Sequence, residues 1–213
     1  MHWEGRMVGV EQATRFLPFA TSDVPGYALT RNTAAHWSVR LWGHLGPLWA
    51  DGFSLGLSQA RISILRGYAR QDAMGRWIAD FLIAPEEGAQ DPGMHDYLAL
   101  AFGAHPRDDG APVVLSHYAL DGSPDLGSVL YLEVRGPDRI GFLGSLLRTL
   151  ARLALAPREM MISTRDGEAV DRFFLQTVSG QVPPDEARRA LAHTLESARV
   201  ASRARAAEAS LAW

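Results

Sequence analysis

The residues best suited to chemistry lie in the segment GPDRIGFLGSL, residues 136–146. This segment joins an apolar stretch, VLYLEV, to a leucine-rich run, and it places Asp138 and Arg139 in the connection. A helix that begins here presents backbone N–H groups without partners and a partial positive charge. Such a terminus suits a small carboxylate.

Gly141 opens the backbone of this connection to a ligand. Because glycine has no Cβ, a small molecule could closely approach the main chain of Gly141, Phe142 and Leu143. Asp138 could cap the helix or face an ammonium group, and N–H donors beside a carboxylate complement a free α-amino acid. The alternative is a plain connection, in which Asp138 is only a cap and Gly141 only permits close packing of the helix on the sheet.

Periodicity places this connection in a β-α-β-β-α order. Leucines at i, i+3, i+4 and i+7 predict an amphipathic helix, alternating apolar residues predict strands, and Asp-Gly between two strands is typical of a type I′ hairpin. Pro183-Pro184-Asp185-Glu186 predicts the start of a second helix. The expected elements are strands at 129–134, 158–164 and 170–178, a hairpin at Asp166-Gly167 and a helix at 141–155.

The first half of the chain repeats this order at an offset of about 93 to 100 residues. It predicts strands at 27–30, 57–65, 77–83 and 112–115, with a helix that opens at Asp91-Pro92. The fold class is therefore α+β, with two ferredoxin-like βαββαβ units, antiparallel sheets and helices on one face. The expected domains are an arm or edge strand at 1–24 (TRFLPF, 14–19), units at 25–120 and 128–200, a linker at 121–127 and a helical tail at 201–213.

The first-half counterpart of the connection is expected at residues 30–44, where Asp-Arg-x-Gly is missing. Arg31, Asn32 and His36 stand there instead. The seven-residue spacing of Trp42 and Trp49 predicts that they share one helical face, more typical of a core or a subunit interface than of an aromatic ligand pocket.

Composition excludes several kinds of site. The chain has no cysteine and no lysine, so thiolate nucleophiles, Schiff-base lysines and sulfur-ligated zinc are excluded. No His, Asp and Glu set has metal spacing, and we expect neither metal nor cofactor. A net charge of −3 argues against nucleic-acid binding. No apolar run reaches the length of a membrane span, so we expect a cytoplasmic protein without membrane contact.

Residues 128–196, with GPDRIGFLGSL and the following hairpin, resemble an ACT domain, whose first strand often leads into Asp-Arg-x-Gly before a leucine-rich helix. The first half resembles one through its element order and GFSLGLSQARISI. The overall plan is similar to tandem ACT regulators of the glycine-cleavage-repressor kind. The resemblance implies an amino-acid site at an interface of two units. It would be formed by Asp138, Arg139, Ile140, Gly141, Phe142 and Leu143, with Gln59 or Arg61 from the second strand of the neighbouring unit.

Three functions follow as hypotheses. The first is a regulatory protein that binds an amino acid or a derivative and forms a homodimer. The second is a small biosynthetic enzyme acting on an amino-acid-derived or aromatic substrate. There, His36 would supply acid–base chemistry because imidazole titrates near neutrality, Arg31 would hold a carboxylate, and Asn32 would lie beside them. The third is an oligomerisation or partner-binding module with no ligand.

Overall fold

The computed structural model describes residues 23–103, 113–122 and 129–211. The expected strand at 14–19 and most of the expected linker lie outside these ranges. The described chain is an α+β structure, built from one antiparallel sheet and helices packed on one of its faces. No helix in these ranges is both long and apolar enough to cross a membrane.

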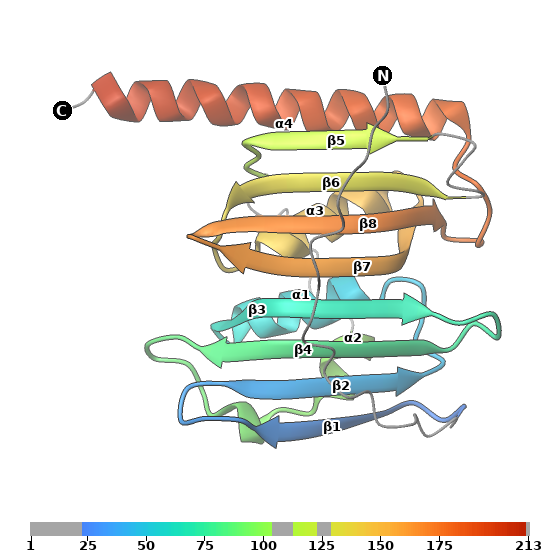
Figure 1. Ribbon diagram of the computed structural model, residues 1–213, viewed down its shortest axis with the longest axis vertical. Helices are drawn as coiled ribbons and strands as arrows, with labels where there is room; N and C mark the ends of the chain where they lie inside the picture. The colour runs from blue at the N-terminus through green and yellow to red at the C-terminus, as the bar shows by residue number, and fades with distance from the viewer. Residues whose placement is uncertain (1–22, 104–112, 123–128, 212–213) are drawn as a thin grey trace, which may run out of the picture.

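Eight strands form this sheet in the order β1-β2-β4-β3-β7-β8-β6-β5 (Figure 1). Every neighbouring pair of strands runs antiparallel. The strands are β1 Gly26–Arg31, β2 Trp37–Gly43, β3 Ile62–Gln71, β4 Trp77–Pro85, β5 His117–Asp121, β6 Leu130–Pro137, β7 Leu155–Arg165 and β8 Glu168–Thr177.

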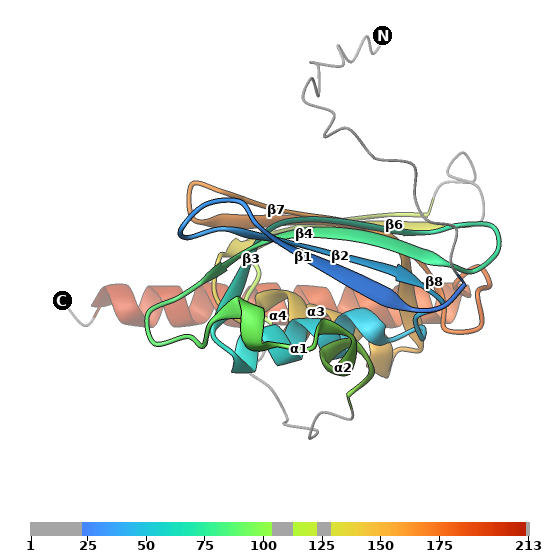
Figure 2. The ribbon, with the colours of Figure 1, turned by 90° about the horizontal axis from the view of Figure 1, so that it is seen from below.

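In the described ranges the helices lie together below the sheet, and no helix lies on its other face (Figure 2). They are α1 Trp49–Gln59, α2 Tyr97–Phe102, α3 Phe142–Arg152 and the 27-residue α4 Asp185–Leu211, with a short 3-10 helix, η1, at Pro92–Met94. Helix α4 packs beside β5, where Tyr118 Oη lies 3.5 Å from the carbonyl oxygen of Ala192. The expected tail at 201–213 is therefore mainly the continuation of α4.

The second half follows the sequence prediction closely. The strands β6, β7 and β8 and the helix α3 overlap the expected ranges, although α3 already ends at Arg152 and Leu155, expected in the helix, begins β7. Asp166 and Gly167 join β7 to β8 with φ values of 52° and 76°, as a type I′ turn requires. Leu146 and Leu150 of α3 are fully buried against this part of the sheet, so the leucine period does identify the inward face of the helix.

The expected pair of separate sheets is replaced by one continuous sheet. Strands β3 and β7 pair antiparallel from Arg66↔Ser163 to Arg70↔Glu159, which joins the two halves. Strand β5 lies inside the range expected for the first unit, yet it pairs with β6. The expected strand at 112–115 is wrong, since the described residues 113–115 have no regular structure and the strand begins at His117.

The expected helical face shared by Trp42 and Trp49 is also wrong. Trp42 lies in β2, where Val39 and Leu41 alternate with it and are fully buried. Helix α1 begins only at Trp49 and runs to Gln59, three residues into the range predicted as a strand. Its buried side chains Trp49, Phe53 and Leu57 recur every four residues, a spacing typical of a helix. The alternating pattern after the helix forms a strand only from Ile62.

Candidate functional site

A cleft lies where the Asp-Arg-Ile-Gly connection meets the first half of the chain. Residues 138–144 form one wall, and β7 and β8 contribute Ile162, Thr164, Ala169 and Asp171. The first half closes the cleft with residues of α1 and with Ile62–Ile64 of β3. Its interior leaves about 40 Å³ for the centres of water-sized molecules, which corresponds to roughly three waters.

The connection itself begins α3 through an unusual backbone conformation. Gly141 is the N-cap residue with φ of 85°, in the left-handed region, and as a glycine it has no side chain with which to cap the helix. The N-cap residue is therefore Gly141 and not Asp138, for which the sequence left capping and facing an ammonium group open. The backbone N–H of Asp138 donates to the carbonyl of Gly167 at 2.9 Å, which ties the connection to the hairpin. The end of the helix faces the cleft, and Ser58 of α1 lines the cleft beside it.

Helix α1 closely approaches this helix end. A Cβ added to Gly141 would lie 3.2 Å from Ser58 Oγ, and one added to Gly144 would lie 3.6 Å from Ser54 Cβ. Small residues therefore let the two helices approach while leaving the cleft between them. Three hydroxyl side chains from the first half, Ser54, Ser58 and Ser63, line the same space.

Asp171 is the residue of this site that the sequence analysis missed. Its side chain lines the cleft, the residue is 1% exposed, and Oδ1 has no hydrogen-bond partner among the described residues. Burial raises the pKa of the Asp171 carboxyl to about 8; a hydrogen bond from the Ser163 backbone opposes the rise, and the Asp138 carboxylate adds to it. Asp171 has the parity of the buried Phe173 and Leu175 in β8, so strand alternation already predicted that it points inward.

The structure brings together most of the residues expected at the amino-acid site. Asp138, Arg139, Ile140, Gly141, Phe142 and Leu143 all line the cleft. Gln59 does not line it; this residue ends α1 rather than lying on a second strand, and the neighbouring Ser58 faces the cleft instead. Arg61 is not among the lining residues and adopts a left-handed φ of 57° between α1 and β3.

The corresponding position in the first half is filled by aromatic rings. Gly43 precedes Trp49 by six residues, as Gly136 precedes Phe142, and Gly43 pairs with Trp77 as Gly136 pairs with Ala169. By this register Trp77 corresponds to Ala169. Trp49 and Trp77 are each 2% exposed, with ring centroids 5.4 Å apart.

By the same register, Asp171 corresponds to Ala79, which is fully buried. A buried carboxylate is therefore not required by the position of this residue in the fold. The two halves share an architecture, but the second half combines small residues with a buried carboxylate where the first half packs aromatic rings.

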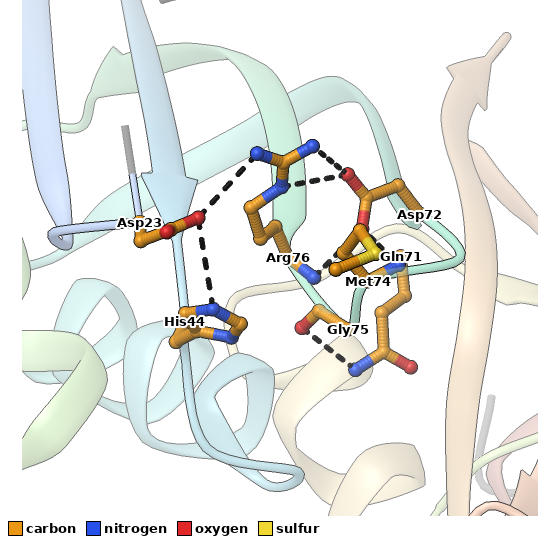
Figure 3. Close-up of polar contacts among 7 residues, drawn as sticks. All are labelled: Asp23, His44, Gln71, Asp72, Met74, Gly75 and Arg76. Atoms are coloured by element: carbon orange, nitrogen blue, oxygen red, sulfur yellow. Dashed lines mark hydrogen bonds and ion pairs between the residues drawn. The ribbon is translucent and has the colours of Figure 1, made fainter. Parts of the chain in front are cut away.

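The connection between β2 and α1 is further covered by the chain that precedes β1. A Cβ added to Gly43 would lie 2.7 Å from the Cα of Pro25. Asp23 lies 3.9 Å from His44 Nε2 and 3.4 Å from Arg76, which pairs with Asp72 at 2.8 Å (Figure 3). These contacts connect the covering segment to the hairpin that joins β3 and β4.

The candidate catalytic residues Arg31, Asn32 and His36 belong to a different feature. They lie at the β1–β2 hairpin rather than at a strand-to-helix connection. Arg31 Nε donates to the Thr33 carbonyl, and the Arg31 guanidinium lies 5.3 Å from the Trp37 ring centroid. Asn32 Nδ2 donates to Ser38 Oγ at 2.7 Å. These local contacts explain the three residues as stabilisers of the hairpin.

We predict that His36→Ala changes the free energy of unfolding by less than about 0.5 kcal/mol, as surface substitutions usually do. The His36 side chain approaches Thr33 Oγ1 at 3.2 Å in a solvent-exposed loop. Chemical denaturation of both proteins measures the difference. A decrease in the free energy of unfolding above about 2 kcal/mol would show that His36 stabilises the protein more than its exposed contacts predict.

No group of three or more His, Cys, Asp and Glu residues is arranged to hold a metal ion in the described part of the chain. No protein-family description matches the chain, and no curated protein matches it. Among solved structures the chain is similar to aspartate kinase from Synechocystis, at 15% identity and a TM-score of 0.40, over 67% of this chain and 24% of that one. The chain thus spans about a quarter of the length of that kinase, and the proposals below rest on the geometry of the cleft.

Proposed function

We propose that this protein is a small-molecule-binding regulatory protein of the tandem ACT type, and that its ligand is a free amino acid or a derivative. One observation supports this proposal: the N-terminus of α3, whose N-cap residue is a glycine, and the buried Asp171 line the same cleft. A helix N-terminus favours a carboxylate, and a carboxylate favours an ammonium group. An α-amino acid carries both groups one carbon apart.

The place of the cleft suits regulation. Its walls come from both halves of the chain, with α1 and β3 on one side and α3, β7 and β8 on the other. A ligand that contacts both sides would stabilise their packing, and this coupling is what a ligand-controlled module needs. We propose units at 25–120 and 128–200, with β5, near the end of the first range, pairing with β6 of the second. We also propose a homodimer that transmits the bound state to a protein partner.

A thermal-shift screen with the twenty free amino acids tests the proposal directly. An amino acid present at about 100 times its Kd adds roughly 2.7 kcal/mol to the free energy of unfolding, which raises the melting temperature measurably. We expect small amino acids to give the largest shifts, because the cleft interior accommodates only about three waters. If none of the twenty changes the melting temperature, the proposed function is wrong.

We predict that Gly141→Ala weakens amino-acid binding at least tenfold. The added Cβ would occupy the space in front of the helix end, 3.2 Å from Ser58 Oγ. Gly167→Ala is a matched control because Gly167 also has a positive φ, of 76°, but a Cβ there meets nothing within 4 Å. Both variants pay a similar backbone penalty of roughly 1–2 kcal/mol, and only the first reaches the cleft. Titration calorimetry that finds equal Kd values for the two variants would contradict the assignment of the site.

A further inference from the structure

Asp171 is a buried carboxyl in a place where the fold does not need one. We propose that Asp171 receives the ammonium group of the ligand, and that the ammonium group displaces a proton which this carboxyl holds in the ligand-free protein. The proposal rests on the proposed function and adds to it the group that selects amino acids and the proton that binding releases.

The geometry of the cleft supports this role. Asp171 is almost fully buried and lines the cleft, and its Oδ1 has no partner among the described residues. An unpaired buried polar atom is costly and rare in folded proteins. Ala79, the residue of the first half that corresponds to Asp171, is two residues after the large side chain of Trp77. Asp171 is two residues after the small side chain of Ala169, and both of these residues line the cleft. The carboxyl and the space thus occur together.

The carboxylate of Asp138 favours a cation beside Asp171. The ionisable side chains that line the cleft in the described chain are Asp138 and Arg139 of the connection, besides Asp171 itself. The faces contributed by α1, β3 and β7 carry only hydroxyl and apolar side chains. Asp138 acts on Asp171 by repulsion between like charges, which an ammonium group placed beside them would relieve.

Proton release follows from the protonation of the two states. Without ligand, burial holds the pKa of Asp171 at about 8, so the carboxyl is protonated near neutral pH. An ammonium group alongside favours the ionised carboxylate, and the proton passes to the solvent. Binding that releases one proton becomes stronger as pH rises, by up to about tenfold per pH unit below about pH 8, and levels off above it.

Matched pairs of acids isolate the ammonium group. The pairs glycine and glycolate, L-alanine and L-lactate, and L-phenylalanine and L-phenyllactate differ by an ammonium against a hydroxyl group. We expect the amino acid of the best-binding pair to bind roughly 10- to 100-fold more tightly than its hydroxy acid, the range of a charge-assisted hydrogen bond. In Asp171→Asn, which keeps the shape of the carboxyl, this preference should fall to within about threefold.

Calorimetry in buffers of different ionisation enthalpy counts the protons directly. At pH 7 the unchanged protein should release close to one proton per amino acid bound, and Asp171→Asn should release none. Asp166→Asn is the matched control, because Asp166 is exposed in the β7–β8 hairpin and its left-handed φ of 52° suits asparagine. This control should keep both the preference and the proton release.

The outcomes separate the inference from the proposed function. Tight binding of an amino acid with no proton release, or with an unchanged preference in Asp171→Asn, overturns the role of Asp171 and leaves an amino-acid site. Equal binding of amino and hydroxy acids has the same consequence. No binding of any acid in the three pairs, after a negative screen of all twenty amino acids, overturns both proposals.

Discussion

Trp77→Ala should lower the free energy of unfolding by about 3–5 kcal/mol, the cost of emptying a large aromatic site in a core. Trp77 is 2% exposed at the start of β4, and its ring packs edge-on against Trp49. Trp49 in turn lies 6.0 Å from Phe53 and 6.2 Å from Phe81, between ring centroids. Removing Trp77 therefore leaves a void next to a cluster of rings that cannot collapse into it without losing their own contacts.

Urea denaturation at constant pH measures this loss, with Trp77→Phe as the control. Trp77 Nε1 has no hydrogen-bond partner among the described residues, so phenylalanine removes a costly buried N–H as well as part of the ring. We expect Trp77→Phe to cost less than about 1.5 kcal/mol, in the range of tolerated hydrophobic exchanges. If Trp77→Ala loses less than about 1 kcal/mol, the first-half position is not packed, and the contrast with the cleft of the second half disappears.

The elements of the second half were predictable because local signals there agree with one another. The leucine period predicted α3, and both residues of the Asp166-Gly167 turn adopt positive φ as expected. The connection at 138–143, which was expected to form part of an amino-acid site, lines the cleft. Local propensity, pattern and turn chemistry all favour the same fold over this stretch, which is the condition under which a single sequence is informative.

The first half was misread because β1 was taken for the counterpart of β6, whereas β2 is that counterpart and β1 corresponds to β5 at the opposite edge of the sheet. Strand β1 precedes the strand that corresponds to β6, so Arg31, Asn32 and His36 were assigned to a strand-to-helix connection when they form a hairpin. The true counterpart of the connection is GHLGPL, residues 43–48, which shares only one glycine with the motif of the second half. Trp42 and Trp49 fit a helical spacing by coincidence, since one lies on a strand and the other begins a helix.

The joining of the two halves into one sheet leaves no local trace in the sequence. It depends on backbone hydrogen bonds between β3 and β7, two strands that each unit alone would leave at an edge. Unpaired edges tend to find a partner, but alternation within a strand does not identify that partner. The cleft depends on the same contact, because α1 and β3 close it from the other half. Gln59 was expected in place of Ser58 because the end of α1 was read as part of a strand.

Asp171 exposes the opposite weakness, since its signal was present and was not used. Its position in the alternation of β8 placed it inward, with Phe173 and Leu175. A carboxyl buried in that way holds its proton more strongly in the folded state than in the unfolded chain. The pKa of Asp171 is about 8 in the folded protein against a model value of 3.8. Burial therefore destabilises the folded protein increasingly as pH rises from about 4 to about 8.

Asp171→Asn should consequently raise the free energy of unfolding by roughly 2–5 kcal/mol at about pH 8, and by almost nothing near pH 4. Asparagine resembles the protonated carboxyl and has no proton to lose, so the variant escapes the cost that the unchanged protein bears. Denaturation at a series of pH values measures the difference between the two proteins, which cancels the titration of other groups. Asp166→Asn should show no such trend because Asp166 is exposed.

A constant difference between pH 4 and pH 8 would mean that Asp171 is ionised throughout, and that the cleft holds a carboxylate already stabilised by its surroundings. A trend of the expected sign would show that Asp171 makes the folded protein less stable than asparagine at the same position would, a loss of stability that is common at functional sites.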